Sequence, residues 1–385
     1  MMRLAIACSL VLYSLGLAAQ PTRSAQEYVR LAMLHDQFVT YTCVRTLHRW
    51  NDDDCIRLRR DQAANGANKV TVLSPLSKQG HTIVDDGRQW TSYDPDRQLV
   101  VVQDSPLARV SKEDIERRFE ILKRNYSLIK EGVDRIAGRV AVRVALQPKA
   151  DELVFSRRYW IDVEKFVLLR VEWTDPCGKS QIVSDTLTIS FPDSISEETF
   201  KPKFLGRPET VRVQAPTRVD SITALSREVG FKVVTPERMP AGLTFTGADV
   251  IKGRRITLAV LRYTDGATNV TLYQAGADKV APWRVPPGGK SIKAGSVYIA
   301  VDGDIPNAGR DAVFKALAAT AQEGEEFILL HNWLDGKDAE RREKRDCDGR
   351  DCDVWPPRKT VIDKEPHRGA GSSAPVANRA PDSVV

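Results

Sequence analysis

The sequence predicts an α+β protein in which a long antiparallel sheet is interrupted by helices. Segments with an apolar–polar period of two dominate, and the clearest covers residues 140–146, where Val and Leu alternate with Ala and Arg. Turn signals such as Asp85-Asp86-Gly87 lie between neighbouring segments of this kind. Two segments with a helical period follow capping signals at Ser24 and Ser111. Strands that follow one another through short turns favour antiparallel pairing over a parallel sheet.

Length and composition exclude several classes of protein. The chain has 385 residues, which predicts two or three domains. Hydrophobic residues make up 42% and charged residues 28%, so neither wholesale disorder nor a polytopic membrane protein fits. The net charge of +6 is small for this length and does not demand a nucleic-acid partner.

The amino terminus predicts export. Arg3 precedes an apolar run over residues 4–17, and the small residues Ala18-Ala19 then offer a cleavage site. This arrangement is typical of a secretory signal peptide over residues 1–19 and is too short for a stable membrane span. Cys8 lies within the apolar run and is expected to be removed with it. No later segment reaches the roughly 18 apolar residues that a span requires.

The first predicted domain covers residues 20–205. Its first helix starts from Ser24, whose capping box includes Glu27, and its second helix starts after Ser111. The strands predicted for this domain cover residues 39–44, 55–59, 69–73, 81–84, 89–93, 98–102, 140–146, 158–162, 166–173 and 180–191.

A linker and a second domain are predicted next. Residues 206–219 show little periodicity and are interpreted as a linker. Residues 220–333 form a smaller α+β unit whose first helix ends at Gly230. Its strands are predicted at 231–235, 258–263, 269–274, 297–301 and 326–331, with a helix at 310–322. The charged tail over 334–385 has no pattern that could bury a core, so it is expected to be disordered.

Motifs for catalysis are not recognised. The sequence has no phosphate-binding glycine loop, no Gly-x-Ser-x-Gly elbow and no His-Glu-x-x-His pair. Its five histidines are not at metal-ligand spacing from one another. We therefore expect a protein that is not an enzyme and holds neither cofactor nor metal. An exported hydrolase whose catalytic residues come from distant loops stays open as an alternative, because spacing along the chain cannot reveal such a site.

The sequence contains six cysteines, and export to an oxidising compartment would allow them to form disulfides. Cys43 and Cys55 lie on neighbouring predicted strands, so a disulfide across that hairpin is expected. Cys347 and Cys352 lie among four aspartates. Calcium or zinc could use such a segment, but a small-loop disulfide is favoured because no further ligands lie at zinc-like spacing. Cys177 lies at a hairpin turn, and the sequence does not fix its redox state.

Apolar and aromatic residues are spread over the strands of the first domain. They could fill an ordinary core against the two helices, which spacing alone favours. Alternatively, a large curved sheet could leave a hollow for acyl chains. The candidates for lining such a cavity are Trp90, Tyr93, Tyr126, Val144, Leu146, Trp160, Trp173 and Phe191.

Several sequence segments occur in an order that is specific as a set. VDDGRQWTSYDP lies at 84–95, NYSL at 125–128, LQPK at 146–149 and RYWID at 158–162. With these segments the first domain resembles the N-terminal domain of the MucB/RseB regulators, which is LolA-like. The second domain, with MPAGL at 239–243 and RYTDG at 262–266, is similar to the smaller domain of the same regulators.

The resemblance implies a fold and a function. It implies an antiparallel half-barrel plugged by helices, an apolar cavity that holds lipid, and a smaller domain that touches a partner in the periplasm. That partner is the exported part of a membrane-anchored anti-sigma factor, which the regulator shields from proteolysis until lipid relieves the shield. The expected function is therefore sensing of lipid or envelope stress. The alternatives are a periplasmic lipid or lipoprotein carrier of the LolA type, which needs only the first domain, and a structural envelope protein.

Overall fold

The computed structural model describes residues 23–51, 54–106, 111–149, 153–253, 256–277, 290–320 and 327–330. The predicted signal peptide, the tail over 334–385 and the Cys347–Cys352 pair lie outside these residues.

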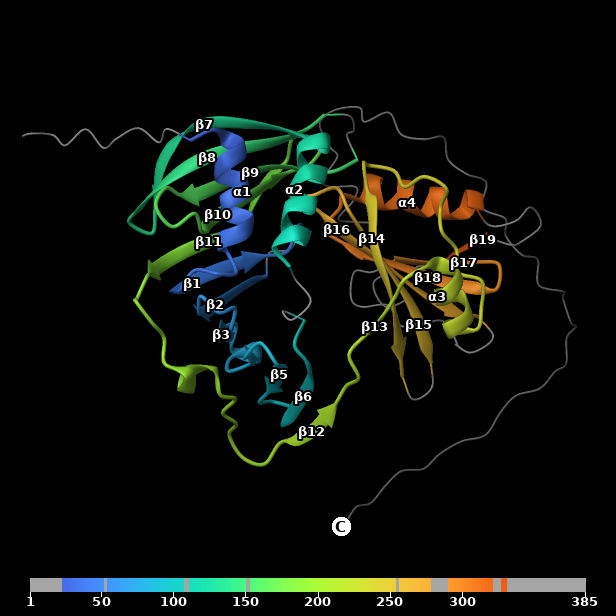
Figure 1. Ribbon diagram of the computed structural model, residues 1–385, viewed down its shortest axis with the longest axis horizontal. Coiled ribbons are helices and arrows are strands. Elements are labelled where there is room, and N and C mark those ends of the chain that lie inside the picture. Colours follow the sequence, from blue (N-terminus) through green and yellow to red (C-terminus); the bar gives the residue numbers. More distant parts are fainter. Residues whose placement is uncertain are drawn as a thin grey trace, which may run out of the picture. The chain divides into compact units, whose positions relative to one another are not determined.

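The larger of two sheets has twelve strands and confirms the α+β class (Figure 1). One meander, β1 to β6, lies beside another, β7 to β11, because β1 pairs with β11. The edge strands β7 and β12 do not pair with each other in the described chain, so the sheet stays open. The meander strands are β1 (Tyr41–His48), β2 (Cys55–Gln62), β3 (Asn68–Ser74), β4 (Thr82–Asp85), β5 (Gln89–Asp94), β6 (Leu99–Asp104), β7 (Tyr126–Ile136), β8 (Arg139–Pro148), β9 (Ser156–Asp162), β10 (Leu168–Thr174) and β11 (Ser180–Ser190).

Two helices cover one face of this sheet, which we call the inner face. Helix α1 (Ala25–His35) lies over β7, β8 and β9, and α2 (Lys112–Asn125) packs beside it and against β7 (Figure 1). Both capping boxes are present: Ser24 with Glu27, and Ser111 with Asp114. Each box satisfies amide groups that the first turn of a helix leaves without partners.

The segment predicted as a linker contains two short strands. β12 (Glu209–Arg212) pairs in parallel with the edge strand β6, and all of its residues are exposed. β13 (Thr217–Val219) pairs with β14 of the second sheet. The segment therefore adds one short edge strand to each sheet. Short 3₁₀ turns, η1 (Leu76–Lys78) and η3 (Glu197–Phe200), complete the first part of the chain.

The smaller sheet has seven strands in the order β13-β14-β15-β16-β18-β17-β19. Helix α3 lies beside β14 and β15, and α4 lies beside β17. Gly230 ends α3 in the left-handed conformation, as the sequence predicts. The remaining elements are α3 (Ile222–Val229), β14 (Thr244–Lys252), β15 (Thr257–Thr264), β16 (Asn269–Gly276), β17 (Lys290–Ala294), β18 (Val297–Gly303), α4 (Asn307–Thr320) and β19 (Phe327–Leu330).

The predicted strand over residues 231–235 is wrong, and its hydrogen bonds give the reason. The amide of Val234 donates to the Gln274 side chain at 2.9 Å, and its carbonyl accepts from the same side chain at 2.6 Å. The amide of Val233 donates to the Ser226 hydroxyl. The backbone of this segment thus forms its hydrogen bonds with side chains instead of with a neighbouring strand. Strands β7, β14 and β17 were not predicted.

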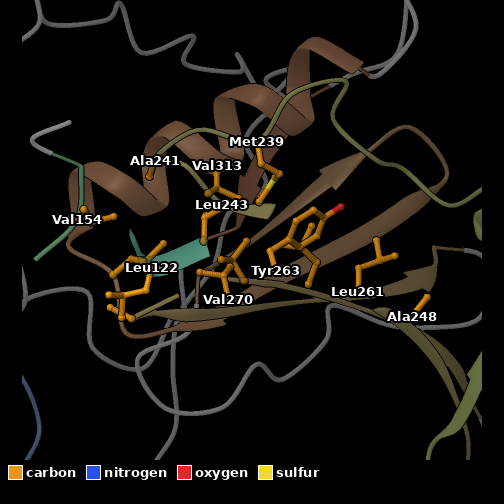
Figure 2. Close-up of a cluster of buried hydrophobic side chains, with 14 of the residues drawn as sticks. Leu122, Val154, Met239, Ala241, Leu243, Ala248, Leu261, Tyr263, Val270 and Val313 are labelled. Carbon is orange, nitrogen blue, oxygen red and sulfur yellow. The ribbon is translucent and has the colours of Figure 1, made fainter. Parts of the chain in front are cut away.

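One hydrophobic core extends across both sheets. It joins residues of α1, α2 and the inner face of the larger sheet to residues of the smaller sheet, α3 and α4. Figure 2 shows Leu122 of α2 and Val154 near Val270 of the second sheet and near Leu243, which directly precedes β14. The two sheets accordingly belong to the same compact unit of the chain.

The turn between β15 and β16, Thr264–Thr268, is the polar centre of this contact. It is buried, and we call it the docking turn. Hydrogen bonds within the turn fix its conformation. The Asp265 carboxylate accepts from the amides of Ala267 and Thr268, at 2.8 and 2.6 Å. The Gly266 amide donates to the Thr264 hydroxyl at 3.0 Å. Because buried amides without partners are costly, these bonds make burial of the turn possible.

The first part of the chain supplies the remaining partners of the docking turn. The Tyr126 hydroxyl donates to the Asp265 carboxylate at 2.7 Å, and the Asn125 side chain donates to the Asp265 carbonyl at 2.9 Å. Burial, with the nearby Asp265 charge, raises the pKa of Tyr126 above its usual range, so the phenol stays protonated and remains a donor. The Arg118 side chain donates to the Gly266 carbonyl at 2.9 Å.

A substitution at Gly266 tests whether this close approach holds the two sheets together. A Cβ atom at Gly266 would lie 2.3 Å from the backbone nitrogen of Leu122, whereas one at Gly138 would meet no atom within 4 Å. Both glycines have positive φ. Gly138→Ala therefore matches the backbone strain without the clash. We expect Gly266→Ala to lower the free energy of unfolding by at least about 1 kcal/mol more than Gly138→Ala, measured by urea denaturation.

Limited proteolysis within residues 206–219 provides the second measurement. Cleavage there is expected to speed up in Gly266→Ala and to stay unchanged in Gly138→Ala. Equal destabilisation of the two variants, with equal cleavage rates, would show that the docking turn does not hold the sheets together.

Candidate functional site: an apolar pocket on the inner face

Alternation along β9 and β10 gives the larger sheet two chemically different faces. On the outer face, Arg158 pairs with Glu131 at 2.7 Å and with Glu172, and Arg170 pairs with Asp185 at 2.8 Å. The inner face carries mainly apolar residues, which the helices cover over β7 to β9. Successive side chains of a strand point to opposite faces of the sheet. The alternation of apolar and polar residues in the sequence therefore makes one face apolar and the other polar.

A pocket of about 470 Å³ opens on the inner face where strands β1, β2, β9, β10 and β11 come together. Its volume falls within the range of small-molecule sites. Most of the wall is apolar, and it also contains the exposed cations Arg49 and Lys78 and the buried Arg157. The lining residues are Leu47, His48, Arg49, Asp54, Cys55, Ile56, Pro75, Lys78, Arg157, Tyr159, Leu168, Val171, Trp173, Val183 and Ser184.

Arg157 is the most buried charge in this wall. Its residue is only 6% exposed, and its guanidinium lies 5.1 Å from the centre of the Trp173 ring. Its two terminal nitrogens donate to the docking turn, one to the Ala267 carbonyl and the other to the Thr268 hydroxyl, the latter at 2.6 Å. Its Nε atom is buried and has no hydrogen-bond partner. Arg157 thus belongs both to the pocket and to the contact between the sheets.

The Trp173 ring is held in place by stacking. Phe155 stacks on it with ring centres 5.0 Å apart, and Trp50 packs on Phe155 at 4.7 Å. The prediction from sequence named Trp173 but neither Trp50 nor Phe155. Trp50 lies at the start of the turn after β1, outside the strand pattern that served to select the candidates.

Most of the predicted cavity residues do not come together. Trp173 lines the pocket. Tyr126, Val144 and Leu146 are fully buried in the core, and Trp160 lies on the outer face, donating to Asp134 at 2.7 Å.

The other predicted residues lie on different strands. Trp90 and Tyr93 are on β5, where the Tyr93 hydroxyl donates to the Leu205 carbonyl at 2.9 Å. Phe191 follows β11 and packs beside Tyr41. The core interpretation therefore describes the fully buried members of the predicted set better than the cavity interpretation does.

The expected Cys43–Cys55 disulfide is wrong, because both thiols are free. The pairing of β1 with β2 gives the reason: Cys43 faces Arg60, whereas Cys55 faces His48. The two cysteines are therefore about five residues apart along the strands, which is roughly 16 Å at 3.3 Å per residue. A disulfide needs Cα atoms within about 7 Å. Cys55 lines the pocket instead, and Cys177 is exposed in the turn between β10 and β11.

Two other clusters are less suited to a ligand. A polar pocket of about 400 Å³ near β2 and β3 includes Arg59, but Asp61 pairs with that arginine at 3.0 Å. His81 comes within reach of Asp94 and Asp96 because β4 and β5 form a hairpin. Here the Asp94 carboxylate lies 3.2 Å from the His81 Nε2 and 3.7 Å from Arg97. Contacts within the chain account for both clusters.

These features define a two-sheet α+β protein with an apolar pocket on the inner face of its larger sheet. Residues 45–203 match the family described as the MucB/RseB N-terminal domain. No curated protein matches the chain in sequence.

Solved structures extend the likeness in fold to the second sheet. A crystal structure of MucB is 16% identical with a TM-score of 0.51, over 76% of this chain and 96% of MucB. The MucA/MucB complex from Pseudomonas aeruginosa is 14% identical with a TM-score of 0.52, over 80% of this chain and 99% of that one. Within the described residues, we find no helix long and apolar enough to cross a membrane.

Proposed function

We propose that the protein is a periplasmic regulator that binds the exported part of a membrane-anchored anti-sigma factor. The observation that carries the proposal is the match of residues 45–203 to the MucB/RseB family. The likeness in fold to nearly the whole length of MucB, which has been solved with MucA(peri), supports it further. A carrier of lipoproteins would need only the first sheet, so the second sheet favours a regulator.

We further propose that the pocket senses an amphiphile. Leu47, Ile56, Val171 and Val183 offer an apolar surface for an acyl chain, and Arg157 offers a cation for an anionic head group. Burying the chain against these residues would be favourable in proportion to the apolar area removed from water. In this proposal the protein catalyses no reaction: the amphiphile acts by binding the free regulator and the regulator–partner complex with different affinities.

The first experiment measures uptake of a fluorescent acyl probe. The wild-type protein is expected to bind it saturably. Val171→Trp should weaken binding by about tenfold, because the larger side chain fills the pocket at a clash cost of about 1–3 kcal/mol. Ile182→Trp is the matched control, since Ile182 lies on the neighbouring strand and does not line the pocket. Uptake that is absent in the wild type, or equal in the two variants, would contradict the pocket assignment.

The second experiment identifies the partner. Tagged full-length protein is expected to recover a single-span anti-sigma factor from an envelope extract, and the purified exported segment of that factor should bind it in a titration. Genes for a sigma factor and an anti-sigma factor next to the encoding gene would supply the candidate. Recovery of acylated lipoproteins in place of an anti-sigma factor would instead identify a carrier of the LolA type.

A further inference from the structure

We infer that Arg157 links the pocket to the docking turn, so that an anionic amphiphile in the pocket releases the second sheet while a neutral one does not. The inference rests on the proposed amphiphile site and adds a mechanism of regulation to it. Three observations carry it: the position of Arg157 in both sites, the neutral character of its two hydrogen-bond acceptors, and an unused donor.

The position of Arg157 is the first observation. The pocket includes Arg157 in its wall, beside Tyr159 of the same strand and Trp173 of the next. The same guanidinium makes hydrogen bonds to the docking turn through both terminal nitrogens. A ligand that draws the guanidinium toward the pocket therefore breaks contacts with the second sheet.

The chemistry of the present partners is the second observation. Both acceptors, the Ala267 carbonyl and the Thr268 hydroxyl, are uncharged. The Asp265 carboxylate of the docking turn attracts Arg157 electrostatically, but the hydrogen bonds of that carboxylate go to Tyr126 and to the amides of Ala267 and Thr268. An anion adds the attraction of opposite charges to these hydrogen bonds, and a carboxylate or phosphate can accept two parallel N–H groups from one guanidinium. A carboxylate or phosphate that reaches Arg157 would accordingly outcompete the docking turn.

The unused donor is the third observation. A guanidinium has five N–H groups, and the buried Nε of Arg157 has no acceptor. A buried donor without a partner is costly. While Arg157 is bonded to the docking turn, its Nε–H group therefore lacks an acceptor. An anionic head group in the pocket would supply that acceptor. By reciprocity, undocking of the turn raises the affinity of the pocket for such an anion.

The test compares two probes with the same chain on the full-length protein. Dodecanoate and dodecanol are added below their aggregation concentrations, at a pH of about 8 where carboxylic acids are ionised. Hydrogen exchange is followed at the amides of Ala267 and Thr268, which are bonded to the Asp265 carboxylate in the docked turn. Dodecanoate is expected to raise their exchange rates by about tenfold, within the usual range for coupled sites, and dodecanol to leave them unchanged.

Two variants assign the effect to Arg157. Arg157→Met is expected to raise the exchange rates without any ligand and to abolish the response to dodecanoate. Arg158→Met is the matched control, because Arg158 is the next residue, lies on the outer face and pairs with Glu131 and Glu172. It should respond as the wild type does. If Arg157→Met does not fold, the wild-type comparison of the two probes decides.

The outcomes separate this inference from the proposed function. If both probes displace the fluorescent acyl probe but neither changes exchange at the docking turn, the amphiphile site stands and the link through Arg157 is overturned. An equal response to dodecanoate and dodecanol overturns the role of the anion and hence the inference. If neither probe binds, both the amphiphile site and the link through Arg157 are overturned.

Discussion

The structure depends on the burial of the polar docking turn against Arg157, Tyr126 and the carboxyl end of α2. Burying a turn is costly because its amides lose their hydrogen bonds to water. In this turn the Asp265 carboxylate replaces the water by accepting from the amides of Ala267 and Thr268. The apolar core that surrounds it can then run without interruption from the helices of the first sheet to the second sheet. Arg157 sits at the edge of this core, where polar satisfaction is incomplete.

The two faces of the larger sheet serve different purposes because strand geometry separates them. Arginines and acids on the outer face form cross-strand pairs, such as Arg143 with Asp134 at 2.9 Å and Arg139 with Asp162 at 2.7 Å. Such pairs tie neighbouring strands together and keep that face polar. The inner face needs a cover, which α1 and α2 supply over β7 to β9. The pocket lies along β1, β2, β10 and β11, with Arg157 and Tyr159 of β9 also in its wall.

Local signals in the sequence predicted many elements but missed strands whose residues break the pattern. β7 contains the polar run Lys130-Glu131-Gly132, which is tolerated because β7 is an edge strand with one exposed side. β14 begins with Thr244-Phe245-Thr246-Gly247, where the glycine interrupts the alternation, and this strand was not predicted either. The Cys43–Cys55 pairing failed because the sequence gives the order of two strands but not their register. Register arises from contacts along the whole hairpin and from the buried face.

By itself the sequence determined the α+β class, the capping boxes at Ser24 and Ser111 and the helix end at Gly230, because each of these depends on neighbours a few residues away. It also carried the resemblance of the first domain to the MucB/RseB family, which the family match confirms. Only the tertiary structure decided that Tyr126 and Leu146 belong to the core while Trp173 faces a pocket. It also decided that Arg157 reaches the docking turn more than a hundred residues away. Which face is covered, and by what, depends on contacts between distant segments, and alternation along a strand cannot encode them.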